Sequence, residues 1–163
     1  MALVRVIKSC VFTGYSSLAW ALSIPEDGKV VACDISTEYT DIGKPFWKEA
    51  GVDNKIDLRI APALDTLQSL IDAGESGTFD FIYVDADKLN ADVIYELSLK
   101  LVRTNGIIAF DNGFMKGEIL LSEENERAGV AAMRKLNMKI KQDPRVSSVM
   151  LNIADGTYVC IKN

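Results

Sequence analysis

Hydrophobic positions along the chain follow two patterns: short apolar runs rich in β-branched residues, and longer segments with apolar residues every three or four positions. The first pattern is typical of buried strands and the second of amphipathic helices. The predicted strands cover residues 3–12, 29–33, 56–60, 79–84 and 106–110, followed near the C-terminus by residues 147–153 and 157–161. The predicted helices cover residues 17–22, 37–50, 62–73, 92–102 and 123–142, and residues 113–122 are expected to form a loop. Ser16 is predicted to cap the first of these helices, and Asp155 and Gly156 to form the turn of a closing hairpin.

The alternation of strands and helices predicts a Rossmann-like, doubly wound α/β fold with helices on both faces of a mostly parallel sheet. We expect seven strands with an antiparallel last strand, because the closing hairpin directly follows the last helix. Residues 79–84 are nearly all apolar, which indicates a strand buried on both faces, and we place the first strand near the centre of the sheet. Residues 1–163 contain no internal repeat or linker, so we expect a single domain, in which residues 1–10 form an atypical leader and first strand.

The composition excludes several kinds of catalytic site. The chain has no histidine, so a Ser-His-Asp triad, a Cys-His dyad and imidazole metal ligands are all ruled out. Its three cysteines are odd in number and form no CxxC pair. This pattern favours buried thiols in a reducing compartment over disulfides or a zinc site.

Net charge and hydropathy exclude further kinds of binding partner. A net charge of −5 argues against binding to a phosphate backbone, so we expect no nucleic-acid partner. No apolar run reaches the roughly 18–20 residues that cross a bilayer, so we expect no membrane segment in this chain. The sequence therefore predicts a cytoplasmic domain that acts on a small molecule, and it leaves an N-terminal anchor or targeting segment open.

Ligands of open α/β sheets bind beyond the carboxyl ends of the strands, and Asp34 follows the second predicted strand there. In nucleoside-binding folds a carboxylate at this place accepts hydrogen bonds from both ribose hydroxyls, although a strand-end Asp also commonly caps the following turn. The first strand is followed by a turn with one glycine, Gly14, and lacks the GxGxxG fingerprint. A nucleoside ligand without a pyrophosphate needs fewer glycines, so the turn favours S-adenosylmethionine over NAD.

Asp85, Asp111 and Asn112 follow two neighbouring predicted strands and offer hard oxygen ligands. Such a set suits Mg²⁺ or a similar divalent cation, and the alternative is that these polar residues cap turns. Lys88 lies three residues after Asp85, where a lysine near a metal and apolar walls can accept a hydroxyl proton. The alternative for Lys88 is a solvated charge at a helix start.

Four segments taken together resemble a known enzyme family: VFTGYSSLAWALSIPEDGKVVACDIS, KIDLRIAPALDTL, GTFDFIYVDADKLN and GIIAFDNGF. They are similar to the cation-dependent S-adenosylmethionine O-methyltransferases, which include the caffeoyl-CoA and catechol O-methyltransferase relatives. The likeness runs from about residue 11 to the C-terminus and is greatest to the animal catechol O-methyltransferase domain-containing proteins.

The resemblance implies a role for individual residues. The implied cofactor-binding residues are Val11, Phe12, Ser16, Asp34, Ile35, Ala63 and Asp85. The implied ligands of the divalent cation are Asp85, Asp111 and Asn112. Lys88 matches the catalytic lysine, and the implied substrate contacts are Asp87, Met115 and Lys116. The implied reaction is methyl transfer to one of two adjacent hydroxyls of a catechol-like acceptor that chelate the ion.

The chain also departs from the family pattern. Lys8 and Cys10 stand where the family has Glu and Gly, Met115 replaces an aromatic residue of the substrate wall, and Lys116 stands where Asn is frequent. The family has several helices before the first strand that cover the cofactor, whereas this chain begins at that strand. We therefore expect residues 1–10 to be a substituted leader, and an apolar patch around the cleft to favour a homodimer.

Three classes of function follow from these observations. The first is an active methyltransferase, favoured by the complete set of Asp85, Lys88, Asp111 and Asn112. The second is a truncated or degenerate relative that binds the cofactor weakly and acts as a dimerisation or regulatory partner, favoured by Lys8, Cys10 and the missing helices. The third is an NAD-dependent oxidoreductase, which shares the fold but is disfavoured because the glycine fingerprint is lacking.

Overall fold

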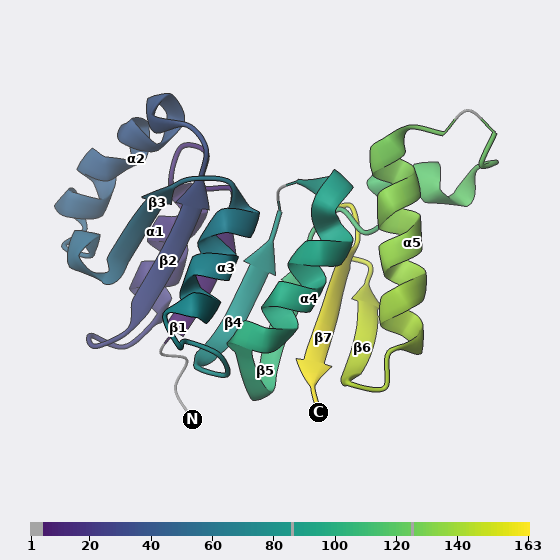
Figure 1. The fold of residues 1–163 in the computed structure, drawn as a ribbon. Coiled ribbons are helices and arrows are strands. Elements are labelled where there is room, and N and C mark those ends of the chain that lie inside the picture. Colours follow the sequence, from purple (N-terminus) through teal and green to yellow (C-terminus); the bar gives the residue numbers. More distant parts are fainter. Residues whose placement is uncertain (1–4, 86, 125) are drawn as a thin grey trace.

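The computed structural model describes residues 5–85, 87–124 and 126–163, and its strands form one seven-stranded sheet (Figure 1). The strands are β1 (Arg5–Ser9), β2 (Lys29–Asp34), β3 (Ile56–Ile60), β4 (Phe79–Val84), β5 (Val102–Phe110), β6 (Val146–Leu151) and β7 (Thr157–Lys162). The α-helices are α1 (Tyr15–Ser23), α2 (Thr37–Glu49), α3 (Ala63–Asp72), α4 (Ala91–Leu101) and α5 (Ala128–Gln142). Short 3-10 helices are η1 (Asp53–Lys55), η2 (Lys88–Asn90) and η3 (Met115–Leu120).

The strand order is β3-β2-β1-β4-β5-β7-β6. Strands β1 to β5 pair in parallel, and β7 runs antiparallel to both β5 and β6. The predicted α/β fold with seven strands and an antiparallel last strand is confirmed. Strand β4 lies in the middle of the sheet between β1 and β5, as its apolar run requires.

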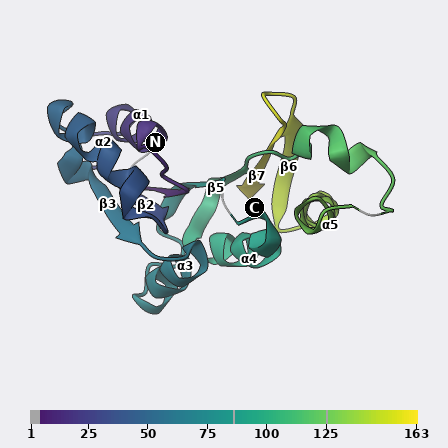
Figure 2. The ribbon, with the colours of Figure 1, turned by 90° about the horizontal axis from the view of Figure 1, so that it is seen from above.

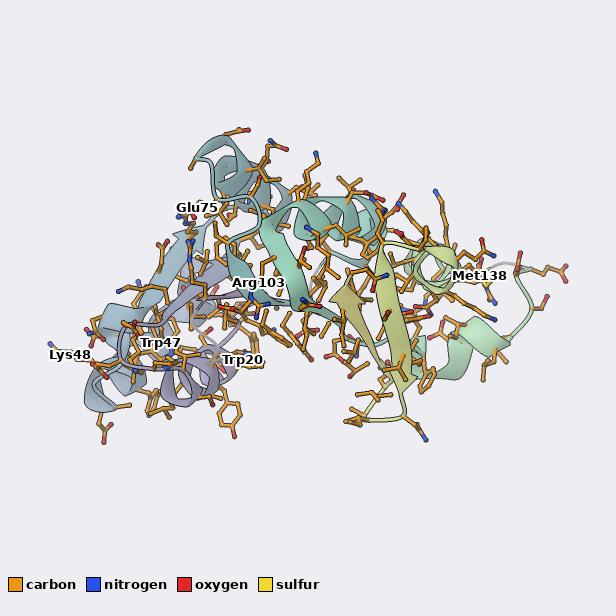
Figure 3. All side chains as sticks on the ribbon, turned by 90° about the horizontal axis from the view of Figure 1, so that it is seen from below. Trp20, Trp47, Lys48, Glu75, Arg103 and Met138 are labelled. Carbon is orange, nitrogen blue, oxygen red and sulfur yellow. The ribbon has the colours of Figure 1, made fainter. Side chains whose placement is uncertain are left out.

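Helices cover both faces of the sheet (Figure 2). A larger core lies between the sheet and α3, α4 and α5, and a smaller core lies between the sheet and α1 and α2. In the smaller core Trp47 of α2 is 3% exposed, and its Nε1 donates to the carbonyl of Gly14 at 3.0 Å (Figure 3). Gly14 has φ 86°, and a Cβ there would lie 2.9 Å from Gly43 Cα, so the glycine allows the two helices to approach closely.

Two helix starts were predicted wrongly. Ser16 lies inside α1 rather than at its cap, and Gly14 in the left-handed conformation precedes the helix instead. Helix α5 begins at Ala128 rather than at residue 123, because residues 122–127 are all polar and give no apolar stripe to bury until Val130.

Two strand boundaries also differ from the prediction. Strand β1 ends at Ser9 rather than at residue 12, because Cys10 and Phe12 have φ 68° and 50° and turn the chain out of the sheet; residues 3 and 4 of the prediction lie outside the described residues. Strand β5 begins at Val102 rather than at residue 106, because Val102 pairs with Phe79 ahead of an irregularity in the ladder. In the described part of the chain no helix is long and apolar enough to cross a membrane.

Candidate functional site

The carboxyl ends of β1, β2, β4 and β5 meet along the upper edge of the sheet in Figure 1, and two cavities open there. The first cavity has a volume of about 470 Å³, and its wall includes Lys8, Cys10, Val11, Ser16, Tyr83 and Asp85. The second cavity has a volume of about 370 Å³, and its wall includes Cys10, Asp34, Ile35, Ala63 and Asp87. Cys10 lies between the two cavities and contributes to both walls, so one elongated ligand would pass over its side chain.

Asp34 holds the turn between β1 and α1. Its Oδ2 accepts hydrogen bonds from the backbone N–H groups of Val11 at 2.8 Å and Phe12 at 2.9 Å, and its Oδ1 accepts one from Ser36 N–H at 2.9 Å. The turn-capping alternative is therefore realised in the structure. The same carboxylate lines the second cavity, so a ribose contact stays a prediction that this geometry accommodates.

Cys10 keeps the backbone conformation of a glycine. Its φ is 68°, a value that costs a non-glycine residue about 1–2 kcal/mol, and its N–H donates to the Cys33 carbonyl at 2.9 Å. Burial raises the pKa of the Cys10 thiol, and the Asp85 carboxylate adds to the shift. The thiol is therefore neutral near pH 7. Because Cys10 lines both cavities, it adds bulk where they meet without adding a charge.

Lys8 is buried in the wall of the first cavity, with 2% of its surface exposed. Its Nζ donates to the Ser9 carbonyl at 3.0 Å and lies 3.3 Å from Asp85 Oδ2. The ammonium also lies 4.6 Å from the centre of the Tyr83 ring. The sequence identifies Lys8 as a departure from the family pattern but gives no signal for its ion pair with Asp85, because the residues are 77 positions apart.

Lys88 joins the ends of β4 and β5. Its Nζ donates to the Asp111 carbonyl at 2.9 Å and lies 3.9 Å from Asp85 Oδ1. Burial lowers the pKa of the Lys88 amine, whereas the nearby Asp85 and Asp111 act in the opposite direction. The structure thus brings together three of the residues predicted for the chemistry.

Asp111 is oriented by its neighbours. Its Oδ1 accepts the N–H of Asn112 at 2.7 Å. Burial raises the pKa of Tyr83, and the charge of the nearby Asp111 carboxylate adds to the shift. Asn112 adopts φ 58°, a conformation that asparagine tolerates better than most residues.

The oxygen atoms of Asp85, Asp111 and Asn112 have the chemistry that Mg²⁺ prefers. Within residues 5–85, 87–124 and 126–163 no group of three or more His, Cys, Asp or Glu side chains is arranged to hold a metal ion. The predicted ligand set contains only two acids and an amide, so it differs from such a group in composition. Its donor chemistry fits a hard cation, and cation binding stays a prediction.

The residues predicted to contact substrate are spread over two places. Asp87 lines the second cavity, and its Oδ2 accepts a hydrogen bond from Asn90 at 2.8 Å. Met115 and Lys116 begin η3 and are not among the described residues that line either cavity. Met115 nevertheless lies near Lys88, since a Cβ on Gly129 would meet Met115 Cε at 3.8 Å and Lys88 Cβ at 3.9 Å. Gly129, at the start of α5, was missed by sequence reasoning because the predicted helix began five residues too early.

The fold is that of a class of methyltransferases. The structure of an O-methyltransferase from Bacillus cereus in complex with SAH is similar to this chain with a TM-score of 0.86 and 27% identity, covering 98% of this chain and 74% of that one. A family model described as O-methyltransferase matches residues 1–163. The chain belongs to the O-methyltransferase family.

Two named relatives agree with this assignment. Probable caffeoyl-CoA O-methyltransferase 1 of Dictyostelium discoideum is 52% identical over 158 residues, which are 97% of this chain and 69% of the relative. Catechol O-methyltransferase domain-containing protein 1 of Mus musculus is 45% identical over 151 residues, 93% of this chain and 57% of the relative. The resemblance is confirmed, although the mouse protein is less similar than the amoeba protein. The oxidoreductase alternative is excluded, and the regulatory alternative gains no support.

Proposed function

We propose that this chain transfers a methyl group from S-adenosylmethionine to one of two adjacent hydroxyls of a catechol-like small molecule, with help from a divalent cation such as Mg²⁺. One observation carries the proposal. Lys88 Nζ lies 2.9 Å from the Asp111 carbonyl and 3.9 Å from Asp85 Oδ1, where β4 and β5 end. A proton acceptor, two candidate metal ligands and the first cavity therefore occur together.

The two cavities suit the two ends of the cofactor. Asp34, Ile35 and Ala63 give the second cavity a carboxylate and apolar walls, which suit a ribose and an adenine. Val11, Phe12 and Ser16 line the first cavity with Asp85, which is where the methionine part would lie. In this arrangement the reactive sulfonium lies toward the β4 side of the edge, near Lys88.

Asp85, Asp111 and Asn112 would hold the cation through carboxylate and amide oxygens. A bound Mg²⁺ would polarise the acceptor hydroxyls and lower the pKa of the one that reacts. Asp85 is 32% exposed at its side chain, so it is accessible from the cavity.

In the proposed reaction Lys88 Nζ accepts the proton of the acceptor hydroxyl. The acceptor oxygen then forms a bond to the methyl carbon while the carbon–sulfur bond breaks, and the sulfonium becomes a neutral thioether. Alignment of the oxygen with the methyl group supplies much of the rate acceleration. Burial of the Lys88 amine favours the neutral form that can accept the proton.

Met115, which lies near Lys88, would contact the acceptor together with Lys116 of η3, and Asp87 would reach it from the wall of the second cavity. The names of the two relatives mention caffeoyl-CoA and catechol, both of which suit an acceptor with adjacent hydroxyls. The same proposal includes a cytoplasmic location and a homodimer. Exposed apolar side chains on α1 and α2, such as Tyr15 at 82% and Phe46 at 56%, support self-association.

The test is methyl transfer from isotope-labelled S-adenosylmethionine to a catechol acceptor and to the matching acceptor with one hydroxyl. We expect transfer to the first acceptor with Mg²⁺, and loss of transfer when a chelator is added. Equal rates for the two acceptors would contradict the adjacent-hydroxyl requirement. Full activity in chelator would contradict the cation requirement, and the absence of transfer to either acceptor would contradict the proposed substrate class.

A further inference from the structure

Lys8 contributes its amino group to the wall of the first cavity. Only 2% of its surface is exposed, and it lies on β1, between β2 and β4 in the sheet. Its ammonium contacts the Ser9 carbonyl at 3.0 Å, Asp85 Oδ2 at 3.3 Å and the face of the Tyr83 ring at 4.6 Å. These three contacts hold a long and flexible side chain in one position.

The same contacts occupy the groups that would attract a cationic ligand. Asp85 is the one carboxylate among the described residues that line the first cavity, and Lys8 is the one other charged residue there. The Ser9 carbonyl and the Tyr83 ring are also acceptors for a cation, and both face the Lys8 ammonium. A ligand ammonium in this cavity must therefore compete with Lys8 for Asp85.

This competition affects the binding of S-adenosylmethionine because that ligand is positively charged. Its methionine part carries a sulfonium and an ammonium against one carboxylate, so it is a net cation. An adenosine thioether such as 5′-methylthioadenosine has the same nucleoside but no charge on its sulfur and no amino-acid group. By engaging Asp85, Lys8 withholds the carboxylate that would attract the cationic ligand, whereas a neutral ligand has no charge–charge attraction to lose.

We propose that Lys8 makes the first cavity discriminate against the positively charged sulfonium cofactor and in favour of neutral adenosine thioethers. The inference rests on the proposed function, because it assumes that an adenosine ligand binds across both cavities. Lys8 acts here as a specificity-determining residue at the cofactor site. Its removal frees Asp85 to bind the ligand ammonium and also removes a like charge from the wall.

The test measures the dissociation constants of S-adenosylmethionine and 5′-methylthioadenosine by calorimetry without added metal. The variants are Lys8→Met and Lys8→Gln, which remove the charge, and Lys8→Arg, which keeps it. Lys44→Met is the matched control, since Lys44 is a half-exposed lysine of α2 whose ion pair within the described residues is with Asp41. Binding of 5′-methylthioadenosine reports at the same time that each variant is folded.

We expect Lys8→Met and Lys8→Gln to bind S-adenosylmethionine about tenfold more tightly than the wild type, the size of one moderately screened charge–charge interaction. Binding of 5′-methylthioadenosine should be unchanged, and Lys8→Arg and Lys44→Met should behave like the wild type. If both ligands bind but their affinity ratio is the same in all variants, the inference about Lys8 is overturned while the proposed function stands. If neither ligand binds any variant, the proposed function itself fails.

Discussion

The carboxyl ends of β4 and β5 match the pattern of the resembled family more fully than the carboxyl ends of β1 and β2. On the β4–β5 side Lys88 Nζ donates to the backbone carbonyl of Asp111 and lies within ion-pairing range of Asp85. The β1–β2 side has Lys8 and Cys10 where the resembled family has Glu and Gly, and Cys10 holds a strained φ of 68°. The residues proposed for the chemistry thus keep the resembled pattern, whereas two positions on the β1–β2 side, Lys8 and Cys10, depart from it.

In the proposed function, one sheet edge divides two tasks between its strands, and the ion pair of Lys8 with Asp85 is the contact that joins the two sides. Parallel strands bring their carboxyl ends together, but each loop that follows a strand can change without moving the others. Changes on the β1–β2 side should therefore affect ligand affinity, and changes on the β4–β5 side should affect turnover. The predictions below test that separation, beginning with the largest expected effect.

Lys88→Ala should lower the rate of methyl transfer by about 10²–10⁴-fold, the usual loss when a general base is removed. Affinity for the cofactor should stay nearly unchanged, because Lys88 contacts the ends of β4 and β5 and not the β1–β2 turn. Single-turnover transfer to a catechol acceptor with saturating Mg²⁺ measures the first quantity, and calorimetry measures the second.

Lys88→Arg is the matched control for that experiment. A guanidinium keeps the positive charge and the hydrogen bonds but cannot accept a proton near neutral pH, so the rate should stay low. A full rate in Lys88→Ala would mean that the lysine takes no part in proton transfer. A fall in cofactor affinity as large as the fall in rate would break the separation of the two sides.

Asp34→Ala should lower the free energy of unfolding by about 1–3 kcal/mol, since it leaves three backbone N–H groups without their charged acceptor. Two of these groups, on Val11 and Phe12, fix the turn that lines the first cavity, so cofactor affinity should fall as well. Asp111→Ala is the control on the other side and should reduce turnover while cofactor affinity is kept. Denaturant unfolding and calorimetry check both, and equal losses of affinity in the two variants would argue against the comparison.

Cys10→Gly should raise the free energy of unfolding by about 1 kcal/mol, because glycine adopts φ near 68° without the clash of a Cβ. It should also strengthen cofactor binding by widening the passage between the two cavities. Cys10→Ala keeps a Cβ and should give no gain in stability. Urea unfolding of the wild type, Cys10→Gly and Cys10→Ala measures these changes in stability. Identical midpoints for the two variants would show that the backbone conformation at Cys10 is not strained.

The fold could be predicted from sequence because each strand carries a strong local signal. The apolar run 79–84 fixes β4 in the middle of the sheet, and the topology then places the ends of β4 and β5 side by side, which explains why Asp85, Lys88 and Asp111 were found. The contact of Lys8 with Asp85 could not be predicted, since a side chain's burial and rotamer depend on residues from distant strands. The position of Met115 beside Gly129 could not be predicted from the sequence either, because Met115 and Lys116 adopt left-handed conformations that their residue types do not favour.

The smallest expected effect is the loss of stability at low pH in the helices that support the β4–β5 side. Arg145 donates to both carboxylate oxygens of Glu96 at 2.9 Å and also pairs with Asp143. Hydrogen bonds from Arg145 lower the pKa of Glu96 and of Asp143 to about 2 each. Both folded values lie below those of the unfolded chain, near about 4, so the pairs stabilise the fold above that pH and lose their contribution as the pH falls toward 2.

Arg145→Gln should therefore reduce the loss of stability between about pH 5 and pH 2, the range in which the wild-type pairs become protonated. Arg127→Gln is the matched control, since Arg127 pairs with Glu118 on an exposed loop with 67% of its side chain in solvent, and such pairs contribute little. Amide hydrogen exchange near pH 3 should show α4 and α5 opening before α1 and α2, because Glu96 and Asp143 lie on α4 and at the end of α5. Exchange that accelerates equally in all four helices would show that the two sides of the sheet unfold as one unit, and the separation would then hold for function but not for stability.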